Sequence, residues 1–88
     1  MRMGLDSVEL VMEIEEFFEI SIPDEDAATM RTVGDVTNYV TQALADLGRP
    51  RPREVVFEQV CGVTCEQCGT TRDQLTEDTS FVNDLGID

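Results

Sequence analysis

The sequence contains neither histidine nor lysine. Without histidine, the chain lacks the commonest general base and the commonest metal-binding side chain. Without lysine, it lacks the amine on which Schiff-base chemistry depends. An enzyme with its own catalytic machinery is therefore not expected, and binding to another molecule is the more natural way for this chain to act.

Positive charge is scarce throughout the 88 residues. Six arginines stand against nineteen aspartate and glutamate residues, which gives a formal net charge of −13. Because phosphate groups repel such a surface, we expect neither nucleic-acid binding nor attraction to an anionic membrane. A basic protein surface is the natural complement of this chain, since opposite charges speed the encounter of two proteins.

Long hydrophobic runs are also absent. No apolar stretch approaches the roughly 20 residues needed to span a bilayer, and the opening segment Met1–Asp6 turns acidic without the apolar core of a signal peptide. We expect a single cytoplasmic domain, since 88 residues allow one modest hydrophobic core. In that reducing location the three cysteines are expected to be thiols.

Apolar residues at helical spacing predict a first helix from Asp6 to Ile20, with Asp6 or Ser7 as its cap. The residues of its core-facing stripe are Leu10, Val11, Ile14, Phe17 and Phe18. A second stripe on this helix is acidic, and its members are Glu9, Glu13 and Glu16. Like charges on one face repel and forgo the stabilising pairs of a mixed surface. This face is therefore either a solvated surface or a docking site for a basic partner.

Two further helices are predicted in the next stretch of the chain. Acidic residues suit the first turn of a helix, and they open a short one from Asp24 to about Met30. Thr32 and Asp35 have the spacing of a capping box at the start of the next helix, and Gly48 is placed to end it. The core of the molecule is expected to include the apolar face of this longer helix.

The segment 48–52 is a short, stiff and basic linker of Arg and Pro after Gly48. The three arginines of this stretch and its border, Arg49, Arg51 and Arg53, are expected to pair with acidic side chains nearby. A fourth helix is predicted from about Arg53 to Cys61, with Gly62 at its end. Everything from Val63 onward is expected to be mostly loop. The residues expected to anchor that loop to the bundle are Leu75, Phe81, Val82 and Leu85.

Two stretches of this sequence resemble the acyl carrier family. Residues 5–27, LDSVELVMEIEEFFEISIPDEDA, and 32–36, TVGDV, are similar to the second, third and fourth helices of that family. Residues 75–88, LTEDTSFVNDLGID, resemble the loop that precedes the second helix there. The resemblance implies an all-α fold, a small bundle of three to four helices with a long C-terminal loop.

The two stretches occur in the reverse of the family's order, which implies a circularly permuted domain over residues 1–88. In that interpretation, residues 1–47 correspond to family helices II–IV, residues 48–52 are the linker, and residues 53–88 correspond to family helix I and loop I. Chain ends of small domains often lie close together, so a short linker can join the old ends. The alternative is a fragment that spans two tandem carrier domains.

Proteins of this family carry their substrate on 4′-phosphopantetheine, which is attached to a serine at the start of the second helix. Two registers compete for that serine here. In one, Gly4 occupies its place and Asp88 supplies the preceding aspartate across the chain ends. In the other, Ser7 follows Asp6 and carries the arm. Helix amides and the helix dipole favour a phosphodiester at either place, and Ser7 is alternatively a simple helix cap.

The resemblance also implies partners: a phosphopantetheinyl transferase and acyl-processing enzymes, in fatty acid, polyketide or related thioester metabolism, that present basic patches. The residues expected to face these patches are Asp6, Glu9, Glu13 and Glu16. Without the arm, the protein would be an adaptor or regulatory module bound through the same face. A monomer and a dimer that exchanges halves both remain open.

The three cysteines carry a further alternative, a small metal- or redox-binding protein. Cys61, Cys65 and Cys68 have the spacing C-x3-C-x2-C. A zinc site would lack an obvious fourth thiolate or imidazole, although a carboxylate could serve. Two of the thiols could instead form a redox pair. The simpler interpretation is a buried Cys61 at a helix end, followed by two thiols in a loop.

Overall fold

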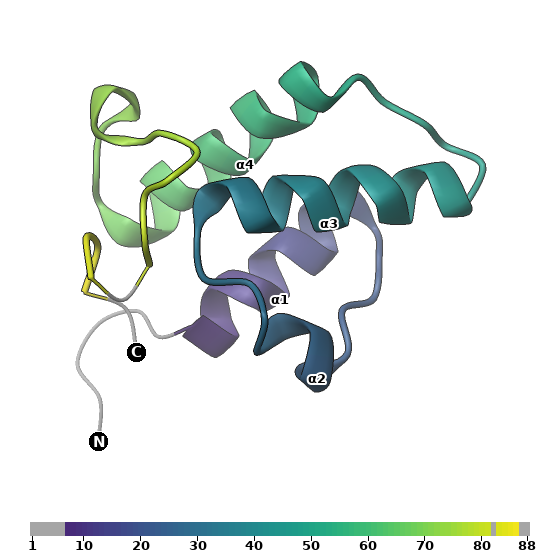
Figure 1. The fold of residues 1–88 in the computed structure, drawn as a ribbon, viewed down its shortest axis with the longest axis horizontal. Helices are drawn as coiled ribbons and strands as arrows, with labels where there is room; N and C mark the ends of the chain where they lie inside the picture. The colour runs from purple at the N-terminus through teal and green to yellow at the C-terminus, as the bar shows by residue number, and fades with distance from the viewer. Residues whose placement is uncertain (1–6, 82, 87–88) are drawn as a thin grey trace.

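The structure is a computed structural model that describes the backbone of residues 7–81 and 83–86, with side chains from residue 9 onward (Figure 1). The elements in these ranges are α1 (Ser7–Phe18), α2 (Asp24–Ala27), α3 (Val33–Asp46), α4 (Arg53–Cys68) and the 3-10 turn η1 (Arg72–Gln74). The described ranges contain no β-strand, only an isolated bridge between Thr32 and Ser80. The expected all-α class is therefore confirmed.

The helices pack around one core in which α4 is central. It contacts both α3 and α1, while the short α2 sits below, between α1 and α3 in the chain (Figure 1). Apolar side chains from every long helix are buried together, and burial of each such side chain stabilises the fold by about 1.5–3 kcal/mol. The wholly buried members of this core are Val33, Val40, Leu44, Val56, Val60 and Cys61.

α1 and α2 are shorter than the sequence pattern predicted. α1 ends at Phe18 because Glu19 adopts a left-handed conformation, with φ of 56°. The amide of Ile20 then donates to the carbonyl of Glu15 at 3.1 Å, which closes the helix end. α2 is a single turn that stops at Ala27. Asp6, predicted at the start of α1, lies outside the described residues.

α3 has the ends that the sequence predicted. The Thr32 side chain accepts from the amide of Asp35 at 3.1 Å, and the Asp35 carboxylate accepts from the amide of Thr32 at 3.2 Å. Together these bonds form a capping box. At the other end, Gly48 has a φ of 76°, a conformation that glycine adopts without steric cost.

The predicted end of α4 was wrong. The helix continues through Gly62 to Cys68, and Gly69, with a φ of 69°, is the residue that ends it. A glycine inside a helix costs only about 1 kcal/mol, and the burial of Val63 and Thr64 just beyond it outweighs that cost. Residues expected in a loop, including Cys65 and Cys68, are thus helical.

The C-terminal segment after η1 docks on the start of α3, at the left in Figure 1. The amide of Val33 donates to the carbonyl of Thr79 at 3.0 Å, and that of Gly34 donates to the carbonyl of Glu77 at 2.9 Å. The first amides of a helix have no partner within it, so this segment satisfies them. Leu75 and Phe81 are buried in the common core. Leu85 is partly buried against it, and Val82 lies outside the described residues.

Candidate functional site

The acidic stripe of α1 lies on its solvent side, as the sequence predicted. Glu9 and Glu16 are exposed, and Glu13 between them is partly buried. Met12, 51% exposed, occupies the same helix face, since residues three and four apart are neighbours on a helix surface. The result is a surface of three carboxylates around one apolar side chain. We call Glu9, Met12, Glu13 and Glu16 the acidic face.

Glu15 does not belong to the acidic face, although it lies in the same run of acids. Its carboxylate accepts a hydrogen bond from the amide of Ile22 at 2.8 Å. That bond ties the connection after α1 back onto the helix and holds Ile22 in the core. The sequence carried no signal for it, because the partner is a backbone amide seven residues away.

Ser7 is the first residue of α1. Its backbone therefore stands where unpaired helix amides and the positive end of the helix dipole favour an anion. Its side chain lies outside the described part of the chain, as do Gly4, Asp6 and Asp88 in full. Two alignments place the attachment serine at Ser7 or at Gly4. Of these two positions, only Ser7 lies within the described residues.

A shallow cleft of about 300 Å³ opens beside the acidic face, between α1 and α2. Its lining residues are Val11, Met12, Glu15, Ile22, Asp24, Ala27 and Ala28. Most of these side chains are apolar, and the buried Ile22 forms part of the wall. Such a cleft suits a small apolar group, with carboxylates only at its edge.

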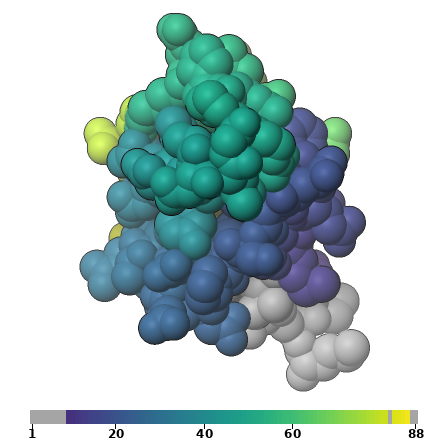
Figure 2. Space-filling view, turned by 90° about the vertical axis from the view of Figure 1, so that its right-hand side faces the viewer, coloured from purple at the N-terminus to yellow at the C-terminus, as the bar shows by residue number. Residues whose placement is uncertain are grey.

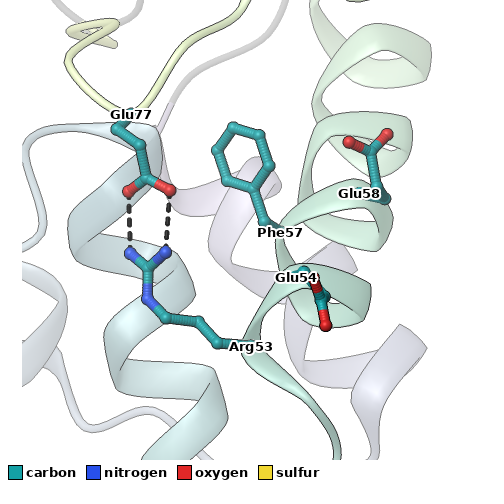
Figure 3. A pocket seen from close by; sticks show the side chains of 5 residues that line it. All are labelled: Arg53, Glu54, Phe57, Glu58 and Glu77. Carbon is teal, nitrogen blue, oxygen red and sulfur yellow. Dashed lines mark hydrogen bonds and ion pairs between the residues drawn. The ribbon is translucent and has the colours of Figure 1, made fainter.

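A second, more open groove of about 410 Å³ lies on α4 and is lined by Arg53, Glu54, Phe57, Glu58 and Glu77. Figure 3 shows the guanidinium of Arg53 facing both carboxylate oxygens of Glu77, each at 2.7 Å. Hydrogen bonding from Arg53 lowers the pKa of Glu77. This pair joins the first turn of α4 to the C-terminal segment, so the groove is part of the structural framework.

Arg72 makes a similar pair further along α4. It donates to the two carboxylate oxygens of Glu58 at 3.0 and 2.6 Å, and its guanidinium lies 5.1 Å from the ring centre of Phe57. The hydrogen bonds from Arg72 lower the pKa of Glu58. Arg72 also donates to the carbonyl of Leu75 at 3.0 Å. It thereby fixes the chain that leaves α4.

Of the three arginines at positions 49, 51 and 53, Arg53 pairs with a carboxylate, that of Glu77, as the sequence predicted. The other two bond to uncharged partners within the described residues. Arg49 donates to the carbonyls of Phe18 and Glu19 at 3.1 and 2.7 Å, at the end of α1. Arg51 donates to the side chain of Gln59 at 2.9 Å and lies over the ring of Phe18. Figure 2 shows the linker side of the molecule, with teal residues from the end of α3 packed against dark blue residues that follow α1. Arg49 supplies the positive charge that the last turn of α1 lacks.

The cysteines follow one side of α4 rather than a loop. Cys61 is buried, and Cys65 and Cys68 are partly buried against the core. Burial raises the pKa of both Cys61 and Cys68. Within the described residues, no group of three or more cysteine, aspartate or glutamate side chains is arranged to hold a metal ion. The geometry therefore offers no support for the metal-binding alternative.

Comparison with known proteins singles out the N-terminal part of the chain. Residues 2–40 match the family model described as the phosphopantetheine attachment site. Acyl carrier proteins from three strains of Clostridium perfringens, SM101, ATCC 13124 and 13, are each 58% identical over 39 residues, which is 44% of this chain and 51% of each relative. The chain thus spans about half the length of the curated relatives it matches. No solved structure gives a significant match.

The matched segment spans α1, α2 and the first part of α3 within the all-α bundle. Residues 2–40, 39 of the 88, are thus similar to the acyl carrier family. No helix in the described part of the chain has the length and apolar character to cross a bilayer.

The N-terminal end of α1 fits the cofactor that this family implies. It offers Ser7 as the first helical residue, and the amides of the first turn of a helix are available to a phosphodiester. The matched family model is that of the attachment site itself. Ser7 is the serine that the described residues place at this helix end.

Proposed function

We propose that this protein is an acyl carrier, or a carrier-like protein, that presents a thioester-bound acyl group to partner enzymes. The observation that carries the proposal is the match of residues 2–40 to the attachment site, with Ser7 at the start of α1. When attached, 4′-phosphopantetheine supplies a long flexible arm with a terminal thiol that forms the thioester. The chain's own contribution is to hold that arm, orient it and offer a surface for docking.

The acidic face is the docking surface in this proposal. Its carboxylates Glu9, Glu13 and Glu16, together with Asp6, meet basic patches on acyl-processing enzymes and on a phosphopantetheinyl transferase. The exposure of Glu9 and Glu16 and the net charge of −13 support this role. Complementary charge mainly raises the rate of encounter and sets orientation. The exposed Met12 adds an apolar contact at the centre of the surface.

The apolar cleft between α1 and α2 provides a place for the acyl chain between reactions. Its volume of about 300 Å³ and its largely apolar lining suit a short hydrocarbon. Burial of apolar surface contributes about 25 cal/mol per Å². A few methylene groups in the cleft would therefore shield the acyl chain from water without holding it irreversibly.

We further propose that the domain is circularly permuted, with residues 1–47 as family helices II–IV, 48–52 as linker, and 53–88 as family helix I and loop I. The docking of the C-terminal segment on α3, and the burial of Leu75 and Phe81 beside Leu10 and Ile14, support a core shared by both halves. Light scattering in solution distinguishes a closed monomer of 9.8 kDa from a dimer that exchanges halves.

Intact mass tests the carrier function. After incubation with coenzyme A and a broad-specificity phosphopantetheinyl transferase, the chain should gain roughly 340 Da, the mass of one phosphopantetheine arm. The gain should vanish in Ser7→Ala and persist in Ser21→Ala, a matched control at an exposed serine outside the helices. No gain in the wild type would favour the unmodified adaptor, the alternative suggested by the register that places Gly4 at the serine position.

A further inference from the structure

The last two turns of α4 carry thiols that the proposed function does not use. Cys61, Cys65 and Cys68 are all free, and their spacing places them on one side of the helix. Cys61 is completely buried, whereas Cys65 and Cys68 are partly accessible. Cys65 and Cys68 can therefore be reached by a reagent in solution, whereas Cys61 cannot.

We propose that Cys65 and Cys68 form a reversible disulfide within the chain, which makes the end of α4 sensitive to redox conditions. Residues three apart on a helix have Cβ atoms about 5–6 Å apart, whereas a disulfide needs about 3.5–4.5 Å. A rigid helix interior resists that closure. Cys68, however, is the last residue of α4, and the left-handed Gly69 follows it with open space around it. The final turn can therefore tighten towards the open side at Gly69, with a change in how Cys68 packs against the core.

The surroundings distinguish the roles of the two thiols. Cys65 is one of the groups that raise the pKa of Arg72, so its sulfur lies within electrostatic reach of that guanidinium. The thiolate, not the thiol, is the form that attacks a disulfide. Burial, with a smaller effect from Cys65, raises the pKa of Cys68 and keeps it as a thiol. Cys65 is accordingly the attacking group, and Cys68 the group that resolves the intermediate.

The oxidant is a small-molecule disulfide such as oxidised glutathione. The Cys65 thiolate bonds to one glutathione sulfur, and the other glutathione leaves as a thiolate. The Cys68 sulfur, after losing its proton, then attacks Cys65, and the second glutathione leaves as a thiolate. The protein loses two electrons and two protons, the oxidant gains the electrons, and the two released thiolates take up the protons.

The test uses the full chain, equilibrated in excess oxidised glutathione, then unfolded and alkylated with N-ethylmaleimide. We expect the number of alkylated cysteines to fall from the three free thiols to one, Cys61, and to return to three in excess reduced glutathione. Cleavage after Arg53 and Arg72 releases one peptide that contains all three cysteines. Fragmentation of that peptide should place the bond between Cys65 and Cys68.

Variants provide the second readout. Cys61→Ala should still form the disulfide, whereas Cys68→Ala should retain a stable glutathione adduct on Cys65 because the resolving thiol is gone. The location of the disulfide in the wild-type chain is measured independently, so that result holds even if a variant fails to fold. Three alkylated thiols under oxidising conditions, a bond that includes Cys61, or a disulfide-linked dimer would each overturn the proposal.

Discussion

Gly34 in the first turn of α3 gives the sharpest test of how the C-terminal segment is held. A Cβ atom built at this position would lie 2.6 Å from a carboxylate oxygen of Glu77 and 2.8 Å from its carbonyl oxygen. The Gly34 amide also donates to that carbonyl at 2.9 Å. The substitution Gly34→Ala therefore has to push the backbone at Glu77 away from the helix.

The expected loss of stability follows from three contributions. Overpacking costs about 1–3 kcal/mol, and a lost hydrogen bond costs about 1 kcal/mol more. Alanine in place of glycine returns about 0.5–1 kcal/mol through helix propensity. We expect Gly34→Ala to lower the free energy of unfolding by about 1–3.5 kcal/mol. For a domain of this size, each kcal/mol shifts the melting temperature by roughly 4–8 °C.

Gly62 in α4 is the matched control. It is exposed, and apart from its two chain neighbours and the adjacent helix backbone, no atom lies within 4 Å of a Cβ built there. Gly62→Ala should therefore stabilise the protein by about 0.5–1 kcal/mol. Urea denaturation followed by far-ultraviolet circular dichroism measures both changes. If both substitutions stabilised the protein, the C-terminal segment would not be packed against Gly34, and the described core would be incomplete.

Three further variants test the structure. Glu19→Gly should stabilise the chain in urea by about 0.5–1 kcal/mol, because a side chain in the left-handed conformation is strained and its charge lies at a helix C-terminus; a loss of stability would contradict this. Arg53 lowers the pKa of Glu77 in the folded state, so the pair stabilises at neutral pH and its contribution, under about 1 kcal/mol for exposed groups, is lost as pH falls through that pKa. Glu77→Gln should accordingly differ from the wild type in urea at neutral pH more than at acid pH, and an equal difference at both would refute the pairing. Replacing Glu9 and Glu13 by lysine should slow modification by the transferase at low salt, where charge steering is strongest, and an unchanged rate would remove the docking role.

The ends of α3 could be predicted because their determinants are local. The pairing of Thr32 with Asp35 spans a single turn, and Gly48 follows the last apolar residue directly. The acidic face was predictable for the same reason, since helical spacing alone places Glu9, Glu13 and Glu16 together.

The end of α4 was predicted too early because core packing overrides the local tendency of glycine to end a helix. Gly62 is a common type of helix terminator, yet the core beyond it holds Val63 and Thr64 in helical positions. The contacts of Arg49 were not predicted because its partners, the carbonyls of Phe18 and Glu19, lie about thirty residues earlier in the chain. Every residue has a backbone carbonyl, so the sequence does not indicate which ones accept a hydrogen bond. Attachment at Ser7 remains a prediction.

The most direct test of the carrier function is to locate the arm on the chain. Fragmentation of the protein after treatment with coenzyme A and the transferase should assign the added phosphopantetheine to Ser7, at the first turn of α1. Modification at another residue, or an unmodified chain under conditions that load a known acyl carrier protein, would contradict the account.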